Sequence, residues 1–126
     1  MIEVLRDFPG NVIAVVCSGR VTRLEYDTVL VPVVTAALKA HPKLRLYYET
    51  GSGFSIEPSA IWEDFRLGVE HLTRWARIAV VTDVEWVRHT VRAFSFLMPG
   101  EVRTFTTSEA ARARAWIGEE LAPAES

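Results

Sequence analysis

The sequence predicts an α/β protein whose strands and helices follow one another in the order ββαβαβαβα. Residues 78–81 form a continuous apolar run of mostly β-branched side chains, which is typical of a strand buried on both faces. Asp83 follows at once and is the expected N-cap of a helix. The apolar positions of that helix recur at helical spacing: Val84, Val87, Val91, Phe94 and Met98. A strand that leads directly into an amphipathic helix is the repeating unit of parallel α/β sheets, which gives the fold class.

The composition fits one globular domain over residues 1–121, followed by a frayed tail over residues 122–126. Of the 126 residues, 49% are hydrophobic and 24% charged, so the chain can bury a sizeable core. The net charge of −2 indicates neither a nucleic-acid partner nor an anionic membrane surface. Cys17 is the only cysteine, which fits a reduced, cytoplasmic setting. No signal peptide is expected, and no apolar run approaches the ~20 residues of a transmembrane helix.

The chain begins with a predicted β-hairpin. Residues 2–6 and 12–19 have the pattern of strands, and the segment between them contains proline, glycine and asparagine, which favour turns. Two strands with so short a connection pair antiparallel, so we expect them at one edge of the sheet. Cys17 lies among valines and is interpreted as a small buried apolar residue.

The first helix has a clear start and an interruption. Thr22 and Glu25 have the spacing of a capping box, which opens the helix. Pro32 breaks the pattern, so the sequence predicts a short helical turn followed by a main helix over residues 32–40. Residues 44–49 then return as a strand.

The second helix follows an irregular, glycine-containing segment. Ser55 or Ser59 is the expected N-cap, and Pro58 is tolerated in the first turn of a helix that runs to about Leu72. Large apolar side chains recur along one face of this helix: Ile61, Trp62, Phe65, Val69 and Leu72.

The last elements repeat the strand-then-helix pattern. The helix that follows Asp83 should run to about residue 97, and residues 102–105 form the last strand. Thr106 and Glu109 have capping-box spacing and open the final helix. The apolar positions of that helix are Ala110, Ala113, Trp116, Ile117 and Leu121.

These elements resemble the SpoIIAA-like proteins, small bacterial domains related in fold to STAS domains, which include anti-sigma-factor antagonists. The matching positions are residues 19–22, Tyr26, Pro32, residues 62–64, residues 77–81, Asp83, Trp86, residues 102–105, Ala115 and Trp116. The resemblance implies a mixed five-stranded sheet with the first strand antiparallel at the edge, the rest parallel, and four main helices packed on it. It also implies a regulatory protein-interaction module as one functional expectation. Related folds include lipid-carrying domains, in which helices move off the sheet to admit an apolar molecule.

No set of residues has the spacing of a catalytic or metal site. The three histidines, His41, His71 and His89, fall on separate segments without metal-ligand spacing, and we expect them at the surface. Glu63, Asp64 and Glu70 share one helix and are better explained as a solvated face than as an acid/base pair. Ser18 and Ser52 lack the nucleophile-elbow motif. We therefore expect a non-enzymatic protein without a metal or cofactor.

Two alternatives concern individual polar residues. An enzyme would use Asp83 or Glu49 at the carboxyl ends of strands, although a helix cap and a surface charge are simpler roles. STAS antagonists are switched by phosphorylation of a serine in an Asp-Ser-Ser-Gly-like motif. The corresponding region here, residues 49–53, lacks the aspartate and the adjacent serines. Ser52 is nevertheless a candidate phosphorylation site, because a phosphate near a helix N-terminus is stabilised.

The aromatic residues point to a binding function. Most of them must be core. Five apolar residues around the start of the second helix are candidate ligand-binding residues: Phe54, Ile56, Ile61, Trp62 and Phe65. Plain core packing explains them too, and they could instead form a lid over an apolar pocket between the second helix and the sheet, or a patch for a second subunit. The sequence thus predicts a domain that binds an apolar small molecule or lipid, with homodimerisation and a protein partner as further expectations.

Overall fold

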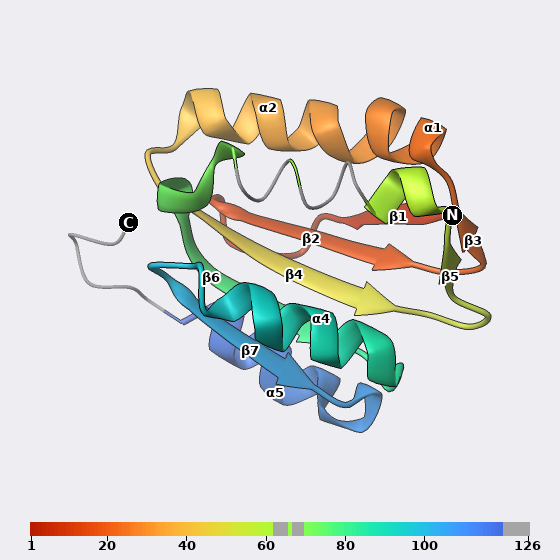
Figure 1. The fold of residues 1–126 in the computed structure, drawn as a ribbon. Coiled ribbons are helices and arrows are strands. Elements are labelled where there is room, and N and C mark those ends of the chain that lie inside the picture. Colours follow the sequence, from red (N-terminus) through yellow and green to blue (C-terminus); the bar gives the residue numbers. More distant parts are fainter. Residues whose placement is uncertain (62–65, 67–69, 120–126) are drawn as a thin grey trace.

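A five-stranded sheet organises the structure, a computed structural model that describes residues 1–61, 66 and 70–119 (Figure 1). Its strands lie in the order β1-β2-β4-β6-β7. They span β1 (Ile2–Leu5), β2 (Val12–Cys17), β4 (Leu44–Thr50), β6 (Trp75–Val81) and β7 (Glu101–Phe105). β1 is antiparallel to β2, and all other neighbours are parallel, which confirms the predicted mixed sheet. Residues 78–81 are buried in β6 between two other strands, as predicted for a strand covered on both faces.

A second, two-stranded sheet was not predicted. Its strands, β3 (Arg20–Val21) and β5 (Ser55–Ile56), pair in parallel. The backbone N–H of Ser55 donates to the carbonyl of Gly19 over 2.8 Å. The interpretation of Ser55 as a helix cap was therefore wrong, because its backbone is committed to strand pairing. Ser59 is not the cap either, because it already lies inside a helix that begins at Pro58.

The first helix is continuous rather than interrupted. It consists of α1 (Arg23–Glu25), a π-helical turn η1 (Tyr26–Leu30) and α2 (Val31–Ala40). The predicted capping box is present. The π-helical turn closes with a hydrogen bond from the N–H of Val31 to the carbonyl of Tyr26. A proline has no N–H and crowds the carbonyl four residues earlier, and the wider turn accommodates Pro32 without a break.

The later helices start where the sequence predicts, with one correction. The helix after β6, α4 (Glu85–Ser95), has Val84 and not Asp83 at its N-cap. Met98 is buried but lies beyond the helix end. The capping box of Thr106 and Glu109 is confirmed, and it opens a 3₁₀ turn, η3 (Thr107–Glu109), that continues as α5 (Ala110–Ile117). Leu121 and the predicted tail lie outside the described residues.

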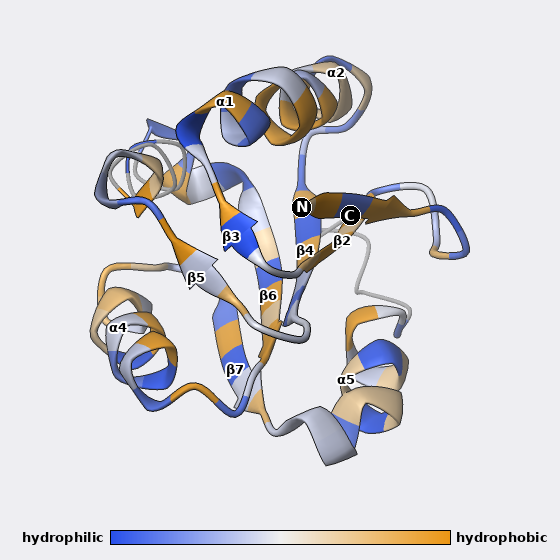
Figure 2. Ribbon diagram, turned by 90° about the vertical axis from the view of Figure 1, so that its right-hand side faces the viewer, coloured by the Kyte–Doolittle hydropathy of each residue, from blue (hydrophilic) through white to orange (hydrophobic). Residues whose placement is uncertain are grey.

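The helices divide between the two faces of the sheet (Figure 2). α5 covers one face, where Trp116 and Ile117 pack against Tyr47 and Ala79. α2, α4 and the helix that begins at Pro58 lie on the other face, over a larger apolar cluster. The two faces therefore have separate cores, and the larger one contains the candidate site described below.

A buried arginine fixes the end of α5 and was not anticipated from the sequence. Arg45 of β4 is 7% exposed, and its Nη1 donates to the carbonyls of Ile117 and Glu119 over 2.7 Å each. Arg77 of β6 donates to the carbonyl of Trp116 over 3.0 Å. Cations are favourable at helix C-termini, where backbone carbonyls lack partners within the helix. Burial, and then the charge of Arg77, lower the pKa of Arg45.

Candidate functional site

An apolar cavity of about 530 Å³ lies between α2, the helix that begins at Pro58, α4 and the sheet. This volume falls within the range of roughly 300–1,000 Å³ that is usual for small-molecule sites. Its floor consists of side chains from three adjacent strands, β4, β6 and β7: Leu46, Tyr48, Trp75, Ile78, Val80 and Val102. Its walls come from the helices and the segment around β5: Leu30, Val34, Phe54, Ile56, Pro58, Ile61, Trp86, Val87, Thr90, Val91 and Phe94. Among these described lining residues none is charged.

Three of the five candidate ligand-binding residues line this cavity. Phe54, Ile56 and Ile61 are among its walls. Trp62 and Phe65 lie outside the described residues. The structure thus brings together the predicted residues that it describes, whereas their role in binding stays a prediction.

Trp86 belongs to the cavity wall and not to the buried core. Its side chain is 45% exposed, and its ring stacks on Phe54 with the ring centroids 6.3 Å apart. Trp86 precedes the buried Val87 by one position, and one residue turns a helix by about 100°. Its ring therefore points away from the buried stripe of α4 and contributes to the rim of the cavity.

Trp75 reaches the cavity because of an irregularity in the sheet. A 3₁₀ turn, η2 (Leu72–Arg74), leads directly into β6. Leu44 pairs with Trp75, but the next residue, Arg45, pairs with Arg77, so the strand carries one extra residue. Such a bulge changes the direction of a side chain. Trp75 consequently packs in the same core as Ile78, while Arg77 contacts α5 on the opposite face.

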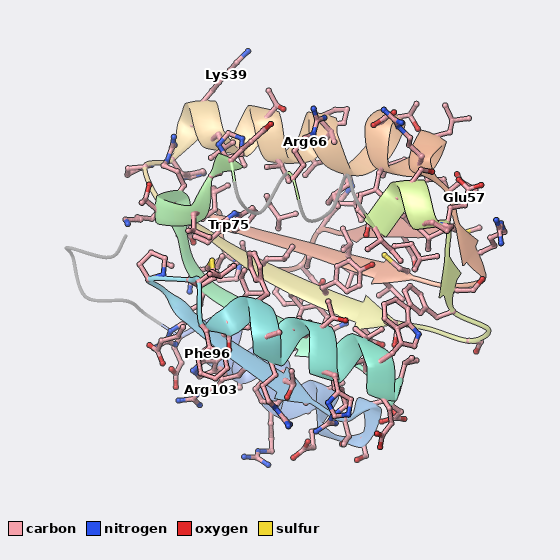
Figure 3. The ribbon with its side chains drawn as sticks, viewed as in Figure 1. Lys39, Glu57, Arg66, Trp75, Phe96 and Arg103 are labelled. Carbon is pink, nitrogen blue, oxygen red and sulfur yellow. The ribbon has the colours of Figure 1, made fainter. Side chains whose placement is uncertain are left out.

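The polar groups of the cavity differ in how they are bonded. The hydroxyls of Tyr48 and Tyr26 lie 3.0 Å apart and hydrogen bond to each other. The Thr90 hydroxyl donates to the carbonyl of Trp86 over 2.8 Å. Trp75 is 3% exposed, and its Nε1 has no hydrogen-bond partner in the described part of the chain. Figure 3 shows this side chain at the end of the sheet where β4 and β6 begin.

The residues of α4 and the sheet floor were missed as site residues by the sequence reasoning. Their apolar spacing is the same for a helix that packs on a sheet and for one that borders a cavity. The sequence also does not predict that Trp75 lines the cavity, because a bulge depends on pairing with a strand far away in the sequence.

The carboxylates proposed for an enzymatic alternative are bonded within the chain. The Tyr47 hydroxyl donates to Glu49 over 2.5 Å, and these side chains share the α5 side of β4. Burial, and then Glu49, raise the pKa of Tyr47 to about 12. Asp83 accepts two hydrogen bonds from Thr107. Across the described residues, no group of three or more His, Cys, Asp or Glu side chains could hold a metal ion.

Ser52 is exposed in the turn between β4 and β5. Its carbonyl accepts a hydrogen bond from the N–H of Gly19. The next element is a strand, and the helix begins only at Pro58. Ser52 therefore does not adjoin a helix N-terminus along the chain, and its phosphorylation stays a prediction without that support.

The fold and the site together define a class: a mixed α/β sheet domain with an apolar cavity between the sheet and the helices on one face. The chain belongs to the SpoIIAA-like family, whose model matches residues 12–118. The fold is similar to the crystal structure of an uncharacterised protein with a SpoIIAA-like fold from Shewanella loihica PV-4. That similarity has a TM-score of 0.70 and 21% sequence identity, and it covers 93% of this chain and 92% of the other. A search of the curated proteins found no match. Of the helices within the described residues, none has the length and apolar character needed to span a bilayer.

Proposed function

We propose that this protein is a non-enzymatic binding domain that takes up an apolar small molecule or lipid between its second helix and the sheet. The observation that carries the proposal is the cavity of about 530 Å³, whose described lining residues include no charged side chain. Transfer of apolar surface from water into such a site is favourable by about 25 cal/mol per Å². The walls therefore favour a ligand by its shape and apolar surface.

The rim of the cavity supports an entry route. Ile61 and Trp86 line the cavity and are also exposed, so they connect the apolar interior to the surface. Phe54 stacks on Trp86 across the rim. A ligand that enters between the second helix and α4 would meet these three side chains first.

Native mass spectrometry of the protein purified from cells, together with binding of a neutral lipid mixture, tests this proposal. Val91→Trp places a large ring inside the cavity, whereas Arg92→Trp places the same ring on the exposed side of α4. We expect the bound species to disappear in Val91→Trp and to persist in Arg92→Trp. An unmodified protein that carries and binds no apolar species would end the proposal, as would equal binding by both variants.

A regulatory protein-interaction module, formed as a homodimer or with another protein, is the second candidate. Phe96 is 87% exposed at the end of α4 (Figure 3). Leu97 beside it is also exposed. Exposed neighbouring apolar side chains of this size are typical of contact surfaces. The test is sedimentation of the purified protein and of Phe96→Ser: a dimer that Phe96→Ser dissociates supports this role. The protein-interaction role is contradicted if the protein is a monomer, recovers no partner from native extract, and gives the same two results after Ser52→Asp.

A further inference from the structure

We infer that two copies of this chain pair through the open edge of β7, so that their two sheets join into one. The two β7 strands run antiparallel about a two-fold axis at Val102, and Glu101 of each copy faces Arg103 of the other. The inference rests on the second candidate function, the homodimer, and names its contact surface. It does not depend on a ligand in the cavity.

The two edges of the five-stranded sheet, β1 and β7, differ in how their outer backbone groups are bonded. On β1, the N–H of Ile2 donates to a carboxylate oxygen of Glu25 over 3.0 Å. On β7, which lies at the end of the sheet between α4 and α5 in Figure 2, no such bond joins the outer backbone to any residue that the structure describes. Unpaired N–H and C=O groups of an edge strand can pair with another strand. The edge of β7 is therefore the one that is open to a second copy.

The register of β7 against β6 decides which of its backbone groups face outward. The carbonyl of Phe105 accepts a hydrogen bond over 2.9 Å from the N–H of the residue that follows β6. Backbone groups of successive residues point to alternate sides of a strand, so those of Arg103 and Glu101 face β6 as well. The N–H and C=O groups of Val102 and Thr104 face outward. An antiparallel partner strand therefore bonds to these two residues.

The charged residues of β7 select one register for the pair of strands. When the two copies of Val102 face each other, Glu101 lies opposite Arg103 of the other copy, and symmetry forms this pair twice. An axis at Glu101 or at Arg103 would place like charges opposite each other, and an axis at Thr104 would form no ion pair. Opposite charges across two strands are stabilising, whereas like charges directly opposite are destabilising. The charge pattern of β7 is thus complementary to itself about Val102.

Both charged side chains are held in place on the α5 face of β7. Arg103 Nη2 lies 3.8 Å from Glu101 Oε2, and the Arg103 guanidinium lies 4.7 Å from the centre of the Trp116 ring. Arg77 Nη2 lies 3.5 Å from the other carboxylate oxygen of Glu101. The side chains of Glu101 and Arg103 are nevertheless half exposed, so a second copy can reach them. Because they are already positioned, pairing costs them less conformational entropy.

Exposed apolar side chains next to this edge enlarge the contact. A stable interface buries roughly 1,200–2,000 Å² in total, which is more than one pair of short strands supplies. Phe96 and Leu97 are both exposed, and they precede β7 by a few residues. The helix that they follow, α4, also contacts β7. The apolar patch and the open edge therefore belong to one continuous surface.

Sedimentation equilibrium of two charge-reversal variants tests the pairing. Glu101→Arg and Arg103→Glu each place like charges opposite each other, and each should raise the dissociation constant of the dimer about tenfold. An equimolar mixture of the two variants should restore the dimer, because every reversed charge then meets an opposite one. Glu3→Arg makes the same substitution at an exposed residue of β1, on the other edge of the sheet, and should leave the dissociation constant unchanged.

Amide hydrogen exchange of the unmodified protein gives a second measurement that needs no variant. The N–H groups of Val102 and Thr104 should exchange more slowly at concentrations at which the dimer forms. A dimer that neither variant weakens, that the mixture fails to restore, or that leaves these two amides unprotected would overturn the edge pairing, and the homodimer would stand. An unmodified protein that stays a monomer would overturn both, because the charges of β7 would then only protect the edge from other strands.

Discussion

Asp83 and Thr107 join the end of β6 to the start of the last helical segment. The N–H of Thr107 donates to one carboxylate oxygen of Asp83 over 3.0 Å, and its hydroxyl donates to the other over 2.5 Å. Asp83 therefore accepts from the first N–H of η3, whose N-cap is Thr106, and does not cap the helix that directly follows Asp83. The hydroxyl of Thr82 accepts from the N–H of Val84 at the start of α4 instead.

Asp83→Ala should lower the melting temperature, because the first turn of η3 loses both hydrogen bonds. These bonds lower the pKa of Asp83 below its ordinary value of 3.8. A lowered pKa in the folded state stabilises the protein above 3.8, and this contribution is lost as the pH falls through the folded pKa. The difference in melting temperature between the two proteins should thus shrink in acid. Glu85→Ala, at an exposed residue of α4, is the control, and a difference that stayed constant with pH would contradict this role.

Trp86→Ala and Trp116→Ala should differ strongly in urea unfolding. Trp116 is a residue of α5 and is buried against Phe105. Truncation of such a ring lowers the free energy of unfolding by about 3–5 kcal/mol. Trp86 is half exposed, so its truncation should cost clearly less; the stacking on Phe54 contributes about 0.5–1.5 kcal/mol beyond the area that the ring buries. Equal losses for the two variants would show that Trp86 is an ordinary core residue.

Gly100→Ala should destabilise the protein by about 1–3 kcal/mol, because the added methyl group overlaps the backbone carbonyls of Trp75 and Ala76. The indole signal of Trp75 should shift as well, since the bulge that positions it must move. Gly10→Ala is the matched control, because its nearest neighbour would be a His41 atom at 3.9 Å. Chemical denaturation that gave the same stability for both variants would disprove the close packing.

Tyr47 should ionise about two pH units later than an ordinary tyrosine, because burial and then Glu49 raise its pKa from 10.0 to about 12. A raised pKa in the folded state means that Tyr47 stabilises the protein fully below pH 10.0. This contribution is lost as the pH rises through about 12. Ultraviolet titration of tyrosinate absorbance, compared between the unmodified protein and Tyr47→Phe, measures the value. A difference spectrum that titrates near 10.0 would contradict it.

The fold was predictable because its signals are local. The apolar run at residues 78–81 and the capping boxes that begin at Thr22 and Thr106 each depend on a few adjacent residues, and all are confirmed. The errors occurred where distant segments meet. The sequence predicts Ser55 or Ser59 as a helix cap, because nothing in the neighbours of Ser55 reveals that Gly19 supplies its backbone partner.

The candidate site was predictable only along one segment. The unusual apolar residues Phe54, Ile56 and Ile61 stand out in the sequence because they follow a glycine-containing turn, and they do line the cavity. The α4 wall and the sheet floor looked like ordinary core, since helical or strand periodicity shows which face is apolar and not whether another side chain fills the space.

By itself, the sequence determined the α/β class, the order of the main strands and helices and the apolar faces, because hydrophobic periodicity and capping act over a few residues. Only the tertiary structure decided which tryptophan is buried and which lies at the rim. Trp75 is turned into the larger core by a bulge opposite Leu44, and Trp86 is left half exposed by its angle on α4. Both outcomes depend on strand register and helix packing, which join residues far apart in the chain.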